Sequence, residues 1–177
     1  TAIDQLAASL NAIDCRIIFI KPSIYDQTAE LERESLMGKN DQLGQFSHYI
    51  DSLAAKYKAD VIDFHTPMGV INHSLQAIDP GASIVGEDRV HPSLPGHLVM
   101  AYHFLKSQNM PQYVSAIQLD AANEGKVLQL INCDLNGSLT VRPGSVRFTA
   151  RENALPFPIN KGQAKALGWV PFQHDLN

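Results

Sequence analysis

The chain has 177 residues, of which 45% are hydrophobic and 18% charged, a composition that suits one domain with a packed core. Its formal net charge of −4 gives no general reason to bind nucleic acid or an anionic membrane surface, so we expect no nucleic-acid partner. No window approaches the roughly 20 apolar residues that a spanning helix needs, and we expect no membrane span.

The N-terminal part of the chain alternates between helical and strand-like patterns. Apolar residues recur at helical spacing in residues 3–11, 42–58 and 68–79, and again from Ser93 to residue 109. Short apolar runs at residues 15–20 and 59–64 are typical of strands buried on both faces of a parallel sheet. This alternation predicts an α/β layer fold around a parallel sheet.

Two strands are too few for a stable parallel sheet, so we expect further strands before Thr1. The first residues have neither the basic nor the apolar stretch of a signal peptide, and the chain does not begin with Met. We therefore expect a mature, trimmed or truncated piece that is missing an N-terminal segment. The compartment stays open, although a secreted or periplasmic protein is suspected.

The pattern changes after residue 112. Strand-like runs follow at residues 114–120, 127–131, 139–141 and 146–150, with a turn expected at Asn136-Gly137. The tail beyond them is rich in proline and resembles a loop. We therefore predict two parts: residues 1–112 form the α/β part, and residues 113–177 form a small β-rich appendage.

The segment Asp88–Pro92 is the part of the sequence that indicates chemistry. A serine esterase needs a histidine to remove the serine proton and a carboxylate to hold that imidazole in the right tautomer. A turn that returns the Asp88 carboxylate to Nδ1 of His91 would leave Nε2 facing a nucleophile. Ser93 is expected to cap the helix that follows and so to anchor the loop.

Residues 88–101, DRVHPSLPGHLVMA, resemble the last conserved block of the SGNH (GDSL-type) hydrolases. In that block Asp-x-x-His-Pro is followed by a Gly-His pair and a helix with small apolar residues, and the order of elements over residues 1–109 is also similar. The resemblance implies the C-terminal part of a three-layer, flavodoxin-like parallel sheet. It also implies that Asp88 is the orienting carboxylate, and that His91 is the general base and then the general acid. Gly96 and His97 match the motif without a chemical role.

The other half of the family's machinery has no counterpart, because the sequence contains no Gly-Asp-Ser. The resemblance therefore implies an ester hydrolase whose serine and oxyanion donors precede Thr1, and the chain alone is expected to be inactive. Its substrate would be a small-molecule ester, an acylated carbohydrate or a lipid. No cofactor is implied.

Residues 38–41 spell Gly-x-Asn-Asp, which resembles the family's oxyanion motif but falls in a loop after the first strand. We interpret Asn40 as a turn residue and Asp41 as the N-cap of the next helix. Ser23 and Ser93 could be proposed as nucleophiles, but neither has the glycine-flanked turn that exposes such a serine.

The seven histidines lack the spacing of a zinc site, and no metal is expected. Cys15 and Cys133 are too few for a disulfide framework and are interpreted as two buried thiols, with a single disulfide left open.

A second class of function also stays open. The chain could belong to a binding or scaffold domain that has lost catalysis and keeps the Asp–His pair for structural reasons. The environment of His91 separates the two hypotheses. An imidazole that opens into a cleft favours the enzyme, and one that is buried with both nitrogens bonded favours the scaffold.

Overall fold

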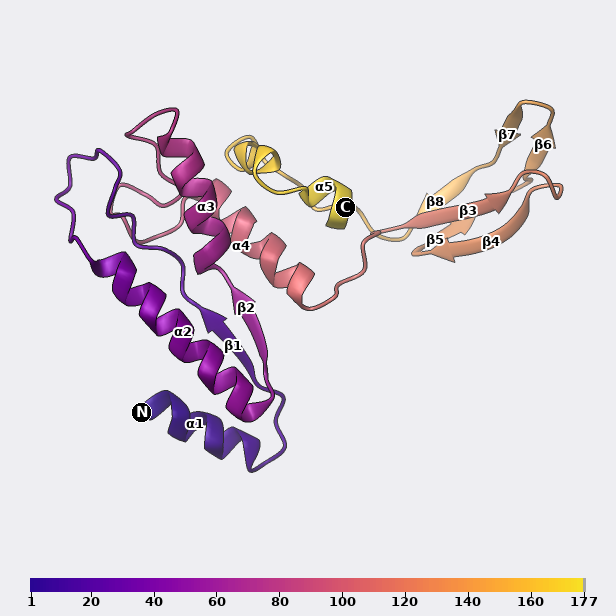
Figure 1. Cartoon of the computed structure of the whole chain (residues 1–177). Helices are drawn as coiled ribbons and strands as arrows, with labels where there is room; N and C mark the ends of the chain where they lie inside the picture. Colours follow the sequence, from indigo (N-terminus) through magenta and orange to yellow (C-terminus); the bar gives the residue numbers. More distant parts are fainter. Residues whose placement is uncertain (177) are drawn as a thin grey trace. The chain divides into compact units, whose positions relative to one another are not determined.

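The computed structural model describes residues 1–176, which divide into two compact units (Figure 1). The first unit comprises Thr1–Gln108 and Asn160–Val170, and the second comprises Asn109–Ile159 and the residues from Pro171 onward. The segment Asn160–Val170, which the sequence analysis placed in the appendage, thus belongs to the first unit. Within the described residues, the helices are too short or too polar to cross a membrane.

The first unit is a mixed α/β structure, as expected. Its elements are α1 (Ala2–Asn11), β1 (Ile18–Lys21), α2 (Lys39–Tyr57), β2 (Asp60–Asp63), α3 (His65–Gln76), α4 (Leu94–Ser107) and the 3-10 helix η1 (Ala164–Gly168). Strands β1 and β2 pair in parallel, with Phe19 beside Val61 and Ile20 beside Ile62. In the part of the chain that the structure describes, this parallel sheet has two strands.

One face of this sheet is covered by helices. Phe19 of β1 is buried in a cluster with Ala7 of α1 and with side chains from the inner face of α2, namely Ile50, Leu53 and Ala54. These positions recur every three to four residues, so α2 presents one apolar stripe to the sheet.

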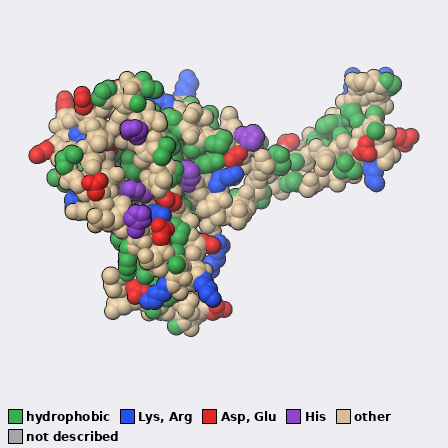
Figure 2. All heavy atoms as spheres, viewed as in Figure 1, with side chains coloured by type: hydrophobic (Ala, Val, Ile, Leu, Met, Phe, Trp, Pro, Cys, Tyr) green, Lys and Arg blue, Asp and Glu red, His purple; other side chains and the backbone are tan. Residues whose placement is uncertain are grey.

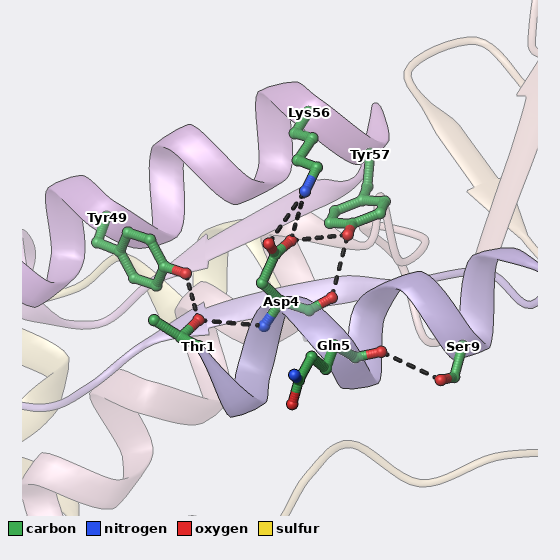
Figure 3. A network of polar contacts seen from close by, with 7 residues as sticks. All are labelled: Thr1, Asp4, Gln5, Ser9, Tyr49, Lys56 and Tyr57. Atoms are coloured by element: carbon green, nitrogen blue, oxygen red, sulfur yellow. Dashed lines mark hydrogen bonds and ion pairs between the residues drawn. The ribbon is translucent and has the colours of Figure 1, made fainter.

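Polar contacts tie the outer helix α1 to α2 (Figure 3). The Asp4 carboxylate accepts from Lys56 Nζ at 2.7 Å and from the Tyr57 hydroxyl at 2.7 Å, and Thr1 Oγ1 contacts the Tyr49 hydroxyl. The Thr1 side chain also caps α1 by accepting from the Asp4 amide. These contacts fix the N-terminal helix against the body of the unit.

The other side of the sheet is contacted by α4. Because side chains alternate along a strand, Ile62 points away from the cluster that surrounds Val61. Ile62, Met68 of α3 and Val99 of α4 are all fully buried. Helix α4 packs against β2 and against η1, so the C-terminal segment completes this side of the unit.

Two helix starts differ from the sequence prediction. Helix α2 begins at Lys39, with Gly38 at the N-cap in the left-handed region at φ 82°, so Asp41 lies inside the first turn and is not the N-cap. Helix α3 begins at His65, directly after β2, with Phe64 at the N-cap, and the Asp63 carboxylate accepts from the Thr66 amide of the first turn at 2.9 Å.

The second unit consists of short antiparallel pairs. Its strands are β3 (Ala116–Asp120), β4 (Lys126–Ile131), β5 (Cys133–Leu135), β6 (Thr140–Arg142), β7 (Ser145–Arg147) and β8 (Ala150–Glu152), followed by the helix α5 (Phe172–Leu176). The pairs are β3 with β4, β5 with β8, and β6 with β7. The segment that contains Asn136-Gly137 therefore does not join two paired strands, although Gly137 does adopt a positive φ of 86°.

The two cysteines have different environments. Cys133 is buried, as predicted, but Cys15 is exposed, and both are free thiols. The prediction for Cys15 was wrong because β1 starts only at Ile18, which leaves Cys15 in the connection that precedes the strand.

Candidate active site

A closed turn holds Asp88 and His91 between α3 and α4. The Gly86 amide donates to the His91 carbonyl at 2.7 Å, and the Arg89 amide donates to the Gly86 carbonyl at 2.9 Å. An antiparallel bridge between Val85 and Pro92 closes the base of the turn. Because Arg89 adopts a left-handed φ of 68°, the chain reverses direction between Asp88 and His91.

The Asp88 carboxylate is held on both of its oxygens. Its Oδ1 accepts from the backbone amides of Val90 and His91, each at 3.0 Å, which is an Asx-turn. Its Oδ2 lies 2.5 Å from Nδ1 of His91. The His91 side chain first, and then the two backbone amides, hold the pKa of Asp88 well below its usual range. The carboxylate is therefore ionised at neutral pH.

The His91 imidazole is bonded on one side and open on the other. Its side chain is 82% exposed, and within the described residues Asp88 is its ring partner. Since Asp88 can only accept, Nδ1 carries the proton and Nε2 keeps its lone pair when the ring is neutral. The geometry thus gives a base whose reactive nitrogen faces away from the turn.

The start of α4 fixes the C-terminal side of the turn. Ser93 caps the helix: its Oγ accepts from the Gly96 amide and donates to the Ile84 carbonyl at 2.7 Å. A Cβ at Gly96 would lie 2.5 Å from that carbonyl, so a glycine is required for the helix to approach residue 84 so closely. The predicted cap is confirmed, and Gly96, which the sequence left without a role, has one in packing. Because both polar functions of the Ser93 hydroxyl are used, this residue is poorly suited to be a nucleophile.

Arg89 is a residue of this region that the sequence analysis missed. Its side chain is only 3% exposed, and its guanidinium donates to backbone carbonyls in the segment from Asp26 to Arg33. The left-handed conformation of a residue other than glycine costs about 1 kcal/mol, which the bonds of the side chain offset. The sequence shows an arginine inside the motif but gives no sign of these backbone partners.

Asp26 is a second residue that the sequence analysis missed. It is 1% exposed, and its carboxylate accepts from Ser83 Oγ at 2.5 Å and from Gln76 Nε2 at 3.0 Å, as well as from the amides of Thr28 and Ala29. Burial opposes ionisation, but these hydrogen bonds outweigh it and hold the pKa of Asp26 below its ordinary value. The carboxylate therefore joins the loop after β1 to α3 and to the strand-like segment that leads into the turn.

Two open pockets flank the turn. One, of about 640 Å³, is lined by residues 30–33 together with Glu87 and Asp88. The other, of about 320 Å³, is lined by side chains of mostly apolar character, among them Pro22, Ile24, Leu43 and Val90. The turn therefore contributes Glu87 and Asp88 to a pocket with mostly charged side chains and Val90 to a more apolar pocket.

Ser23, the other serine considered as a nucleophile, lines the smaller pocket together with Val90 of the turn. Asn40 is occupied locally, since its Oδ1 accepts from the Tyr25 amide at 3.0 Å and lies 3.2 Å from Nε2 of His65. Burial lowers the pKa of His103, although the nearby Asp63 opposes this effect. No group of three or more histidine, cysteine or acidic side chains suited to a metal ion occurs among the described residues.

No protein-family model and no curated protein matches the chain. Among solved structures, the chain is similar to a gut microbial diltiazem-metabolizing enzyme, with 28% identity and a TM-score of 0.79, over 99% of this chain and 42% of that one. The chain thus spans less than half the length of the enzyme that it matches.

The chain is also similar in part to an acetyl xylan esterase from Geobacillus stearothermophilus, seen in two structures. The identities are 19% and 18%, the TM-scores 0.47 and 0.48, and the likeness covers 59% and 61% of this chain and 43% and 44% of the esterase. At these TM-scores the likeness is too weak to support a conclusion about this chain.

Proposed function

We propose that the chain is the C-terminal part of a serine ester hydrolase of the SGNH class, in which Asp88 and His91 are two members of a Ser-His-Asp triad. The observation that carries the proposal is the 2.5 Å contact between Asp88 Oδ2 and His91 Nδ1, combined with an imidazole that is 82% exposed. A residue kept for packing alone would be expected to bury its ring and to bond both nitrogens.

The chemistry follows from the two nitrogens of His91. Nε2 takes the proton of a serine hydroxyl as the serine attacks the acyl carbonyl, and the ionised Asp88 stabilises the imidazolium that forms. The imidazolium then protonates the leaving alcohol, and a water molecule hydrolyses the acyl-enzyme with His91 as its base. The substrate is a small-molecule ester, an acylated carbohydrate or a lipid, and no cofactor takes part.

The serine and the oxyanion donors lie outside this chain in our proposal. The pairing of β1 with β2 would be the C-terminal end of a three-layer, flavodoxin-like parallel sheet that an N-terminal segment completes. The match of nearly the whole chain to 42% of a longer enzyme supports this arrangement. Residues 113–177 would be an appendage to that domain.

Fluorophosphonate labelling, read by intact mass, tests the proposal. We expect no label on the 177-residue chain and one label per molecule on a chain extended at its N-terminus, together with hydrolysis of an aryl acetate. In the extended protein, His91→Ala should abolish both. A stoichiometric label on the short chain that disappears in His91→Ala would instead place the nucleophile within these residues.

The alternative of a catalytically inactive binding or scaffold domain makes the opposite prediction. An extended protein without esterase activity, in which His91→Ala changes nothing, would support that alternative. The imidazole is not buried with both nitrogens bonded, which the scaffold hypothesis expected, but it opens to solvent and does not line either of the two pockets beside the turn.

A further inference from the structure

We propose that Arg89 is a positioning residue that clamps the Asp88–His91 turn to the segment 29–33. The clamp would hold the His91 imidazole in a fixed position relative to residues 30–33, which line the neighbouring pocket. The proposal rests on the proposed function of Asp88 and His91. Arg89 lies between these two residues in sequence and has its own side chain turned in the other direction, into the protein.

The guanidinium group of Arg89 is bonded on all three nitrogens. Nε donates to the Arg33 carbonyl at 2.9 Å, and Nη2 donates to the same carbonyl at 2.6 Å and to that of Leu31 at 3.4 Å. Nη1 donates to the carbonyls of Asp26 and Ala29, each at 3.0 Å. A planar fork with five N–H groups can hold four carbonyls at once, whereas an ammonium group has three donors and no fixed plane.

The backbone of Arg89 bonds to the same loop. The Asp26 amide donates to the Arg89 carbonyl at 2.9 Å, so main chain and side chain hold the loop together. The carboxylate of Asp26 in turn accepts from Ser83 and Gln76, which anchors the loop to the rest of the unit. Any shift of the Arg89 side chain would therefore be transmitted to the turn that contains His91.

The clamped segment is also the wall of the larger pocket. Residues 30–33 line it from one side, and Glu87 and Asp88 line it from the other. The loop between Pro22 and Gly38 has no helix or strand of its own. Without the guanidinium, residues 31–33 would lose the hydrogen bonds that join them to Arg89, while the Asp26 and Glu30 amides would still donate to the Arg89 and Pro80 carbonyls. Arg89 would thus fix the width of the pocket and the orientation of the imidazole together.

The test uses a variant that keeps the turn and removes the clamp. Since Arg89 has a φ of 68°, Arg89→Gly leaves the backbone conformation free of strain while it deletes the guanidinium. Arg89→Lys keeps the charge and most of the stem but loses the fork. Arg16→Ala is the matched control, because Arg16 is an exposed arginine that pairs with Asp60 in the same unit.

The readout is the tautomer of His91 in the chain extended at its N-terminus. It is measured by long-range ¹H–¹⁵N NMR at a pH where the imidazole ring is neutral. His91→Ala assigns the resonance, and Trp169 fluorescence checks the fold. We expect the Nδ1–H form in the wild type and in Arg16→Ala, and a mixture with the Nε2–H form in Arg89→Gly. Arg89→Lys should show a smaller change in the same direction.

Kinetics provide the second readout. In Arg89→Gly, the kcat for hydrolysis of an aryl acetate should fall about tenfold, with a smaller change in KM. A misplaced base reduces the stabilisation of the transition state more than it reduces the affinity for the substrate. An unchanged tautomer in Arg89→Gly, or in Arg89→Lys if the glycine variant does not fold, would overturn the clamp. If no form of the protein hydrolyses esters, the function fails, but the NMR result still decides the role of Arg89.

Discussion

The two units of the chain are stabilised in different ways. In the first unit, residues far apart in sequence meet in a buried interior, and side chains from β2, α3 and α4 are fully enclosed there. In the second unit, the buried apolar side chains among the described residues are Cys133 and Phe172, and strand β4 leaves Val127, Leu128 and Leu130 exposed. Figure 2 shows hydrophobic side chains at the surface of the molecule. The second unit is therefore held mainly by backbone pairing between short antiparallel strands.

This difference explains where the candidate site lies. A base must be held within a fraction of an ångström, which requires supports that do not move with the local chain. The Asp88–His91 turn has such supports, because its neighbours bond to the loop after β1 and to the start of α4. Short hairpins with exposed side chains offer few contacts of this kind.

The largest effect that we predict is in the core of the first unit. Ile62→Ala removes a fully buried side chain from β2 and should lower the free energy of unfolding by about 3 kcal/mol. Leu128→Ala, at a position in β4 that is 52% exposed, should cost less than about 1 kcal/mol. Trp169, the one tryptophan of the chain, reports denaturation of the first unit, and in a Cys15→Ser background the reactivity of the Cys133 thiol reports opening of the second.

Equal losses of unfolding free energy in Ile62→Ala and Leu128→Ala would contradict the difference between the two units, because they would mean that Leu128 is buried in solution. If Ile62→Ala also lowers the stability that the reactivity of the Cys133 thiol reports, the two units unfold together. The expected result is a change in the Trp169 transition alone.

Buried polar groups should show the same contrast. Asp26→Ala leaves the donors on Ser83 and Gln76 without their acceptor and should destabilise the first unit by about 2–3 kcal/mol. In the second unit, Asn153→Ala removes a hydrogen bond to Asp134 that is exposed to water and should cost no more than about 0.5 kcal/mol. Urea denaturation measures both, and similar values for the two variants would contradict the contrast.

The sequence predicted those features that depend on neighbours along the chain. Asp88 and His91 are three residues apart, so one turn suffices to join them, and the cap at Ser93 is equally local. Periodicity predicted the helices because an apolar stripe repeats within each of them. Arg89 and Asp26 could not be predicted in the same way, since Arg89 binds main-chain carbonyls 56 to 63 positions away and Asp26 reaches Ser83 over 57 positions. Any residue can supply a carbonyl, and so these partners leave no pattern in the sequence.

The sequence predicted the short strands near residues 140 and 146, but it did not predict the strand β5 or the exact start of helix α2. The strand at Cys133–Leu135 has three residues and pairs with Ala150–Glu152, and neither the length nor the spacing gives a repeat that could be recognised. The start of α2 was misplaced because Asp41 is a good N-cap by residue type, whereas the left-handed Gly38 begins the helix earlier.

Glycine substitutions distinguish close packing from backbone strain. Gly96→Ala places a Cβ against the Ile84 carbonyl and should destabilise the first unit by about 1–3 kcal/mol, although alanine is the better helix former. Gly69→Ala in α3 meets only an ordinary contact with Ile24 and should stabilise by about 0.5 kcal/mol. In the second unit, Gly137→Ala meets no neighbour within 4 Å, so its cost of about 1 kcal/mol would come from its positive φ alone. Thermal denaturation of the three variants checks this order, which fails if Gly96→Ala is neutral.

The smallest effect that we predict is a dependence of the first unit's stability on acid. Hydrogen bonds hold the pKa of Asp26 and of Asp63 below the ordinary value, despite the burial that opposes ionisation in both. A carboxyl group whose pKa is lower in the folded state stabilises that state above the unfolded pKa, which is about 3.9, and this stability is lost as the pH falls through the folded pKa. The urea midpoint followed by Trp169 should therefore change little between pH 7 and pH 5 on account of these groups and should fall below about pH 4. Asp26→Asn should start from a lower midpoint and show a shallower fall, because one of the carboxyl groups whose pKa is lowered in the folded first unit no longer titrates. A variant that keeps the full acid dependence would show that Asp26 is not a source of it.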